Sequence, residues 1–541
     1  MDAITFPPAP HNEPVRDYAQ GSPERASLAL KLGELTSQQV ELTSTIDGRQ
    51  RMGGGDRIDV VQPHNHAHVL GTTANATHQD AKEAVAAALR AAEAWRSTPF
   101  DERAAILLRA ADLLAHSWRD ILNAATMLGQ SKTVVQAEID AACELADFWR
   151  FNVHYARQIH AEQPYSGPGT WNRLDYRPLE GFVYAITPFN FTAIAGNLPT
   201  APALMGNTVI WKPSPTQGLA AHLTMRLLEE AGLPPGVINL LTGDGVAASE
   251  VILADPALAG IHFTGSTRTF QHLWATVGAN IAGYRSYPRV VGETGGKDFV
   301  VAHASADVDV LRTALVRGAF EYQGQKCSAA SRAYVPRSVW NRLKDDLVSE
   351  VESLTVGDVT DLRNFMGAVI DRRAFDRLTG VLRMAHESPT LSVIAGGTAD
   401  DTHGFFVRPT VVVGEDPTHE VFADEYFGPV LAVHVYDDAD YDRTLQEIDR
   451  RSQYGLTGAV IARDRSAVLR ASQALRFAAG NFYVNDKPTG AVVGQQPFGG
   501  ARGSGTNDKA GATYNLMRWV SPRVIKENFR PPVVSTHPHQ G

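Results

Sequence analysis

The chain has 541 residues, 44% hydrophobic and 20% charged, so it can bury large cores and is expected to form more than one domain. Its 59 acidic side chains outnumber its 50 lysines and arginines, and the net charge of −9 disfavours nucleic acid and anionic membranes as partners. With only two cysteines, Cys143 and Cys327, the chain has no disulfide framework and suits a reducing compartment.

The amino-terminal residues show no targeting pattern. The first twenty lack an apolar signal core and include Asp2, Glu13 and Asp17, which predicts neither a secretory signal nor a transit peptide. Residues 181–211 carry no charge, but prolines and asparagines interrupt them, and a bilayer would leave the freed backbone groups unsatisfied. We therefore expect a soluble, cytoplasmic protein without a membrane span.

In the first 180 residues the hydrophobic periodicity is weak at the start, and a helical pattern begins at Thr77. Thr77 and Asp80 have the spacing of a capping box, and apolar residues follow at helical intervals. Two more helices are expected over 102–118 and 132–155. Turn residues then flank an alternating strand within 163–181, which predicts a projecting hairpin.

From residue 182 onward, short β-rich runs alternate with helical segments. This alternation predicts a parallel, doubly wound sheet that binds its ligand at the carboxyl ends of its strands. The first series has strand runs at 182–186, 208–211, 237–241, 260–263 and 288–291, with helices near 218–231, 245–254 and 267–279. A second series over 298–484 has strand runs at 332–335, 409–413, 430–435, 458–461 and 481–484.

Three segments of the first series are candidates for a dinucleotide site. The segment LLTGDGVAA (240–248) has the glycine spacing of a dinucleotide fingerprint, although glycine-rich turns after strands are common. Gly265 and Ser266 lie between a strand and a helix, where a phosphate could approach the backbone and the helix amino end; a plain turn is the alternative. Lys212 ends a neighbouring strand, either at the ligand edge or as a solvated charge.

Other polar residues could carry chemistry. Cys327 lies next to Lys326, whose charge would favour a thiolate, with a buried inert cysteine as the alternative; Cys143, in a helix, is expected to be inert. Glu293 follows an apolar strand, where partial burial would raise its pKa and suit it to take a proton from water, unless it is an exposed loop residue. The amide of Asn190 is either structural or directed at a substrate oxygen.

Seven ordered motifs make the chain resemble the aldehyde dehydrogenase superfamily along nearly its whole length. They are PFNF (188–191), WKPS (211–214), FTGS (263–266), ETGGK (293–297), GQKCS (324–328), EYFGPV (425–430) and PFGG (497–500). Within the superfamily, the segments 128–145, 187–214, 291–308 and 485–511 are similar to those of the subfamily that oxidises L-glutamate γ-semialdehyde. Thr294, in place of the widespread leucine, points the same way.

The resemblance implies the aldehyde dehydrogenase fold, an α/β fold with a Rossmann-like NAD-binding domain, an α/β catalytic domain and a small β flap for oligomerisation. We expect these at 1–162 with 182–296, at 297–510, and at 163–181 with 511–541, respectively. The implied activity is the NAD-dependent oxidation of L-glutamate γ-semialdehyde, which equilibrates with 1-pyrroline-5-carboxylate, to L-glutamate in the second step of proline catabolism.

The resemblance also implies residue roles. Cys327 would attack the aldehyde, the Asn190 amide and the Cys327 backbone N–H would hold the oxyanion, and Glu293 would activate the water that hydrolyses the thioester. The residues implied to bind the cofactor are Thr187, Lys212, Gly265, Ser266, Glu425 and Phe427. The residues implied to bind substrate are Glu144, Phe191, Ser328, Gly490, Ala491 and Phe498. No metal site is expected.

The substrate groups have separate implied contacts. The backbone of Gly490 and Ala491 and the Ser328 hydroxyl would take the α-carboxylate, and two phenylalanines would enclose the aliphatic chain. Ala491 replaces the serine of some relatives, so it offers only its backbone. Glu144 would contact the ammonium group, with an ordinary helix-surface acid as the alternative. Pro215 stands where many NAD-using relatives carry an acid, which leaves NADP use open.

Two other functions stay open at this stage. One is an aldehyde dehydrogenase for another substrate, such as succinate semialdehyde, which needs no ammonium contact. The other is a catalytically silent member of the superfamily, against which the retained Cys327, Glu293 and Asn190 speak. The family also implies a homodimer or larger assembly through 163–181 and the tail after 511, and substrate exchange with a separate proline dehydrogenase.

Overall fold

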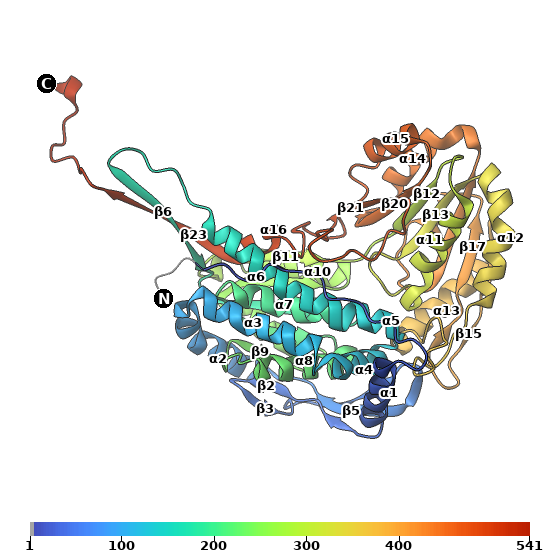
Figure 1. Cartoon of the computed structure of the whole chain (residues 1–541), viewed down its shortest axis with the longest axis horizontal. Coiled ribbons are helices and arrows are strands. Elements are labelled where there is room, and N and C mark those ends of the chain that lie inside the picture. Colours follow the sequence, from blue (N-terminus) through green and yellow to red (C-terminus); the bar gives the residue numbers. More distant parts are fainter. Residues whose placement is uncertain (1–4) are drawn as a thin grey trace.

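The computed structural model describes residues 5–541, which form two lobes, each built on a seven-stranded sheet (Figure 1). In the first lobe the strand order is β11-β10-β7-β8-β9-β2-β3. Strands β7 to β11 are parallel, and β2 and β3 form an antiparallel edge. The strands are β2 Ser44–Ile46, β3 Arg49–Arg51, β7 Phe182–Thr187, β8 Thr208–Pro213, β9 Ile238–Leu240, β10 Leu258–Thr264 and β11 Arg289–Glu293.

Helices cover both faces of this sheet because successive residues of a strand point to opposite sides. Phe182 and Tyr184 of β7 pack in one core with α2, α9 and α10. Val183 and Ala185 pack in the other with α3, α4, α6, α7 and α8. The helices are α2 His78–Ser97, α3 Phe100–Ala115, α4 Arg119–Gln130, α6 Leu145–Ala161, α7 Thr192–Leu204, α8 Gly218–Glu230, α9 Val246–Ala254 and α10 Thr267–Ala279. The predicted doubly wound sheet is confirmed.

The second lobe repeats this plan with the order β14-β17-β18-β13-β12-β20-β21, in which β14 alone is antiparallel among the described strands of the sheet. Its strands are β12 Asp298–Ala302, β13 Ala330–Pro336, β14 Leu391–Ala395, β17 Thr410–Gly414, β18 Val430–Tyr436, β20 Thr457–Ile461 and β21 Asn481–Val484. Helices α11 Val308–Phe320 and α12 Arg337–Ser353 cover one face, and α13 Arg372–Glu387, α14 Tyr441–Arg451 and α15 Arg465–Ala474 cover the other.

The helices before residue 162 differ in part from the expectation. The capping box of Thr77 and Asp80 is present, with each side chain accepting the other's backbone N–H. The helix expected over 102–118 is α3, which ends at Ala115, and the separate helix α4 was not expected. Almost every residue of α4 is buried, including the polar Asn123, Thr126 and Gln130, and the three residues between α3 and α4 contain no glycine or proline that would mark the start of a new helix. The helix expected over 132–155 contains α5 Val134–Ala137, the π-helical turn Glu138–Glu144 and α6.

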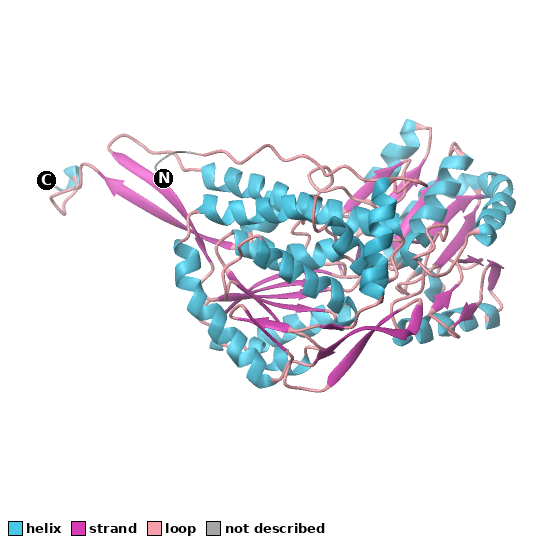
Figure 2. Ribbon diagram, turned by 60° about the horizontal axis from the view of Figure 1, so that its bottom comes forward, coloured by secondary structure: helices cyan, strands magenta, loops and turns pink. Residues whose placement is uncertain are grey.

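The hairpin expected over 163–181 is wrong. Strand β6 (Thr170–Pro178) pairs antiparallel with β23 (Val520–Asn528), from the far end of the chain. The two strands form a ribbon that projects from the first lobe (Figure 2). A strand pattern records that a strand forms but not which segment pairs with it.

The weakly periodic amino-terminal region also has structure. It contains α1 (Pro23–Thr36) and a small sheet of order β1-β5-β4. Across residues 5–541, every helix is too short or too polar to traverse a bilayer. The remaining elements are β1 Val40–Glu41, β4 Arg57–Gln62, β5 Asn65–Ala74, β15 Ala399–Asp400, β16 Phe406–Val407, β19 Tyr454–Gly455, β22 Ala501–Arg502 and α16 Thr513–Met517.

Candidate active site

Two cavities meet at Cys327. The strands of the first sheet reach them with their carboxyl ends, whereas Cys327 and Glu425 lie just before the amino ends of β13 and β18 of the second sheet. The first cavity has a volume of about 1030 Å³ and is lined mainly by the first sheet and its helices. The second, about 330 Å³, lies between the helix 134–161 and the loop 487–498. Cys327 lines both, so a group in either cavity can approach the same sulfur.

A tightly held turn presents Cys327. Tyr322, Gln323 and Gly324 all have φ between 53° and 63°, so the chain reverses sharply before the cysteine. The buried Gln323 amide donates to the Ser131 and Ala368 carbonyls at 2.9 and 2.7 Å, which fixes this turn. Such a turn allows Cys327 to lie 9% exposed at the junction of the cavities.

The surroundings of Cys327 disfavour a resting thiolate, contrary to the expectation from Lys326. Burial raises the pKa of the Cys327 thiol well above its ordinary value, and the nearby carboxyl of Glu293 raises it further. Lys326 instead pairs with Glu321, with 3.5 Å between Nζ and Oε2. The thiol therefore needs a proton acceptor before it can attack. Cys143 also lines the second cavity, but burial raises the pKa of its thiol too, which fits an inert residue.

Asn190 and Glu293 approach the cysteine from the ends of two strands of the first sheet. Asn190 follows β7, is 4% exposed, and donates from Nδ2 to the Gln325 carbonyl at 3.0 Å. Glu293 ends β11 and faces Gly499, where an added Cβ would lie 2.8 Å from Oε1. Burial raises the pKa of Glu293 well above its ordinary value, and Lys509 opposes this shift. Glu293 is thus not an exposed loop residue, and within residues 5–541 it forms no salt bridge.

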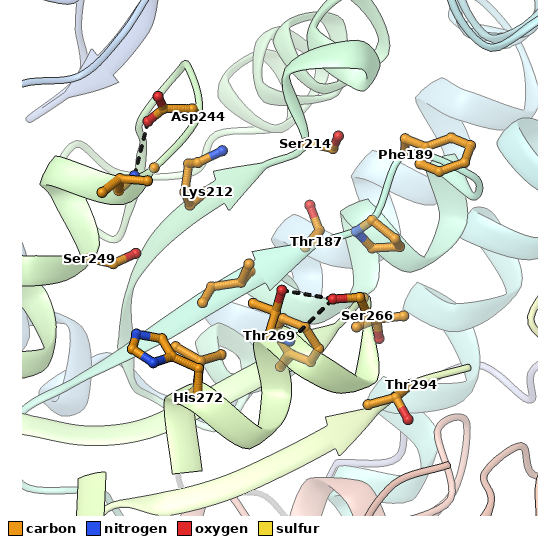
Figure 3. Close-up of a pocket in the computed structure, with 18 of the residues that line it drawn as sticks. Thr187, Phe189, Lys212, Ser214, Asp244, Ser249, Ser266, Thr269, His272 and Thr294 are labelled. Atoms are coloured by element: carbon orange, nitrogen blue, oxygen red, sulfur yellow. Dashed lines mark hydrogen bonds between the residues drawn. The ribbon is translucent and has the colours of Figure 1, made fainter. Parts of the chain in front are cut away.

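All six residues predicted to bind a cofactor line the first cavity. Figure 3 shows Thr187, Lys212 and Ser266 around it. Lys212 is 4% exposed, so it is no solvated charge, and burial lowers its pKa to about 8. Its stem packs on Gly245, where an added Cβ would lie 2.3 Å from Cε.

The groups of the first cavity fit a dinucleotide. Ser266 caps α10, a helix of 13 residues whose free amino-terminal N–H groups favour a phosphate. The neighbouring Gly265 has no side chain to keep a phosphate from the backbone, and Lys212 adds a cation. The segment 240–248 contributes Asp244 and Gly245 to the same wall.

Glu425 and Phe427 close the end of the first cavity next to Cys327. Glu425 accepts a hydrogen bond from the Gly296 N–H at 2.9 Å, and an added Cβ at Gly295 would lie 2.0 Å from its Oε2. Gly295 is therefore needed to let this carboxyl in, whereas a side chain at Gly296 would meet the Asp298 carboxyl and the Cys327 carbonyl. Burial raises the pKa of Glu425 to about 7. Phe427 has φ 53°, and its ring lies 5.8 Å from that of Phe189.

All six residues predicted to bind substrate line the second cavity. Ser328 shares a hydrogen bond of 2.7 Å with Thr489, just before Gly490 and Ala491. Phe191 and Phe498 lie in the same lining. The walls that carry the polar groups come from segments more than 150 residues apart in the sequence.

Glu144 lies in the cavity wall, at the end of the π-helical turn Glu138–Glu144. Burial raises its pKa to about 8, the neighbouring Asp140 raises it as well, and Lys132 opposes both. Lys132 bonds to Asp140 at 2.7 Å and lies 4.2 Å from the centre of the Phe191 ring. A carboxyl in such surroundings gains most from a ligand that brings its own positive charge.

Sequence motifs did not predict several residues of the cavities. Arg373 and Arg377 of α13 reach the first cavity from the second lobe. Asn12, Glu13 and Val15 reach the second cavity from the amino-terminal segment. These residues lie in segments without a recognisable pattern, and only their contacts reveal them. Within residues 5–541, no group of three or more His, Cys, Asp or Glu side chains could hold a metal ion.

Comparison with known proteins agrees with this geometry. Residues 51–525 match the model of the aldehyde dehydrogenase family. A delta-1-pyrroline-5-carboxylate dehydrogenase of Agaricus bisporus is 50% identical over 98% of this chain and 97% of its own. The mitochondrial enzyme of that name from Homo sapiens is 48% identical over 96% and 92%.

A solved structure is similar over the whole chain. The crystal structure of the delta-pyrroline-5-carboxylate dehydrogenase from Mycobacterium tuberculosis bound with NAD has a TM-score of 0.97 and 65% identity, and the match covers 100% of both chains. The predicted fold is therefore confirmed. The chain belongs to the aldehyde dehydrogenase family.

Proposed function

We propose that this enzyme oxidises L-glutamate γ-semialdehyde to L-glutamate with NAD⁺, through a thioester on Cys327. The observation that carries the proposal is the meeting of two cavities at one sulfur, one suited to a dinucleotide and the other polar at both walls. The names of the relatives and of the NAD-bound structure support the same substrate and cofactor.

The first cavity would hold NAD⁺. Gly265 and the α10 amino end would receive the phosphates, Lys212 and Glu425 the riboses, and Phe427 would lie beside the nicotinamide. When bound there, NAD⁺ supplies a hydride acceptor close to Cys327. Pro215 presents no charge to a 2′-phosphate, so we include tolerance of NADP⁺ in the proposal.

Acylation begins at the thiol. Cys327 must lose its proton before it attacks, and Glu293 is the carboxylate placed to accept it. The Sγ–C bond then forms, and the aldehyde oxygen becomes an oxyanion. The Asn190 Nδ2–H, which donates to the Gln325 carbonyl in the free protein, and the Cys327 N–H stabilise that charge. Loss of hydride from the same carbon leaves the thioester.

Deacylation needs a base and a water molecule. The raised pKa of Glu293 makes it a stronger base than an exposed glutamate, because burial favours its protonated form. Glu293 first releases to solvent the proton that it took from Cys327. It then takes a proton from water, the hydroxide adds to the thioester carbon, and the C–S bond breaks. Glu293 returns its proton to the Cys327 thiolate as glutamate leaves.

The second cavity would select the substrate. Glu144 on one wall would bind the α-ammonium, and the N–H groups of Gly490 and Ala491 with the Ser328 hydroxyl would bind the α-carboxylate. Phe191 and Phe498 would enclose the aliphatic chain. An aldehyde without an α-amino acid group leaves the buried polar groups of both walls unpaired, which disfavours it.

We include three further elements in the proposal. The ribbon of β6 and β23 would join copies of the chain, since Val524 is 66% exposed and the strand edges are unpaired. We also propose the domain division expected from the sequence, in which the segments 163–181 and 511–541 form one element; these segments contain the two strands of the ribbon. A separate proline dehydrogenase would supply the substrate, and a reducing cytoplasm would keep both cysteines free.

The test is a purified-protein assay that follows NADH formation with pyrroline-5-carboxylate, succinate semialdehyde and propanal at equal concentrations. We expect the highest kcat/KM with pyrroline-5-carboxylate, and a substoichiometric or absent NADH signal would contradict any dehydrogenase activity. Equal or better use of succinate semialdehyde would contradict the substrate while leaving the family assignment intact.

A further inference from the structure

An amino-terminal strap, residues 5–19, forms part of the second cavity although it precedes the part of the chain that matches the family model. In Figure 1 it is the dark-blue segment that crosses the first lobe before α1. Asn12, Glu13 and Val15 of the strap line the cavity. A segment without regular structure therefore completes the wall of a binding site.

The Asn12 side chain joins the two walls of this cavity. Its Nδ2 donates to Oδ2 of Asp147 at 2.7 Å and to the carbonyl of Val493 at 2.8 Å. Its Oδ1 accepts from Nε2 of Gln495 at 3.0 Å. Asp147 belongs to α6, and the other two partners belong to the loop 487–498. One amide therefore uses both of its polar atoms to link the helix with the loop.

The two linked segments carry the two proposed halves of the substrate site. Asp147 lies three residues after Glu144, so both side chains are on the same face of the helix. Val493 lies two residues after Ala491 in the loop. Among the described residues, no direct hydrogen bond joins this helix to this loop, so the polar connection runs through Asn12.

The strap itself is firmly anchored. The Glu13 N–H donates to the other carboxyl oxygen of Asp147 at 2.7 Å. The Glu13 carboxylate pairs with Arg119 at 2.6 Å and with Arg150 at 2.8 Å, and all three groups are largely buried. The contacts of Glu13 thus fix the position of Asn12, and the hydrogen bonds of Asn12 in turn fix the position of the loop.

We propose that Asn12 is a positioning residue that sets the distance between Glu144 and the N–H groups of Gly490 and Ala491. The inference rests on the proposed function, because the ammonium and carboxylate of the substrate lie on one carbon and both walls must reach them together. A misplacement of about 1 Å between such contacts weakens catalysis strongly. Asn12 would thereby favour α-amino acid aldehydes over simple ones.

The experiment compares N12A with H11A in the full-length enzyme. His11 is the exposed neighbour of Asn12 in the same strap, so H11A controls for a change in the segment. For glutamate semialdehyde we expect N12A to lower kcat/KM roughly tenfold, mainly through KM, because it loses hydrogen bonds on both walls. For propanal, which has neither charged group, kcat/KM should change by less than about twofold. Inhibition by glutamate should weaken in parallel.

A second variant covers the case in which N12A does not fold. Gln495 is exposed and Q495A removes only one bond to Asn12, so a smaller loss in the same direction, roughly threefold, is expected. A folded N12A or Q495A enzyme with the selectivity of the wild type would overturn the role of Asn12. If the wild type itself does not prefer glutamate semialdehyde to propanal, the proposed function fails, and this inference fails with it.

Discussion

The replacement of Glu144 by glutamine tests the substrate site most directly, because E144Q keeps the shape of the side chain and removes its charge. A charge-assisted hydrogen bond to the substrate ammonium is worth about 1.5–3 kcal/mol. Because Glu144 is buried and its pKa is raised, the net contribution of this hydrogen bond is smaller near neutral pH. With a pKa of about 8, Glu144 is mostly protonated at about pH 7, and ionising it costs about 1.4 kcal/mol.

The expected loss in E144Q therefore depends on pH. At about pH 7 the net contribution of this hydrogen bond is at most about 1.6 kcal/mol. The kcat/KM for glutamate semialdehyde should then fall by no more than roughly 15-fold. At about pH 8.5 most Glu144 side chains are ionised in the free enzyme, and the cost of ionisation falls to about 0.2 kcal/mol. The loss should then reach roughly 10- to 100-fold.

The assay measures kcat/KM for glutamate semialdehyde and for propanal at both pH values, in the wild type and in E144Q. D112N serves as the control, since Asp112 is an exposed acid on α3. The ratio of wild type to E144Q should rise with pH for glutamate semialdehyde and stay near one for propanal. A ratio that is equal for the two aldehydes, or that falls as pH rises, would refute the ammonium contact.

Three further predictions concern catalysis and the cofactor. E293Q should lower kcat by about 10²–10⁴ and should also slow the first turnover of NADH, because Glu293 serves as the base in both acylation and deacylation. In the wild type, deacylation should slow as pH falls through the raised pKa of Glu293, and E293Q should lose this dependence; an E293Q enzyme with the kcat and pH profile of the wild type would contradict the assignment. N190A should lower kcat by about 10²–10³ with little change in NAD⁺ binding, as measured by fluorescence titration, and an unchanged kcat would exclude an oxyanion role. P215E should lower kcat/KM for NADP⁺ roughly tenfold relative to NAD⁺, because it adds a negative charge beside the expected 2′-phosphate; an unaltered ratio would place that phosphate elsewhere.

Much of the fold was predictable because its signals are local. The parallel strands of both sheets are short apolar runs bounded by turn residues, and the structure has them within a few residues of the expected bounds. Helix α4 escaped prediction because it follows α3 after only three residues, none of them a glycine or proline that would mark a second helix. The partner of β6 escaped because pairing over more than 340 residues leaves no mark in either segment.

The sequence by itself determined the family, the parallel α/β plan and the motif residues around Cys327, Glu293 and Glu425, since each motif holds its chemistry within a few adjacent positions. Only the tertiary structure decided that Lys326 pairs with Glu321 and that burial keeps the Cys327 thiol protonated. It alone also brought the strap residue Asn12 between the helix and the loop of the second cavity. The physical reason is that desolvation and hydrogen bonding depend on which distant segments pack together, and local residue patterns do not encode that contact.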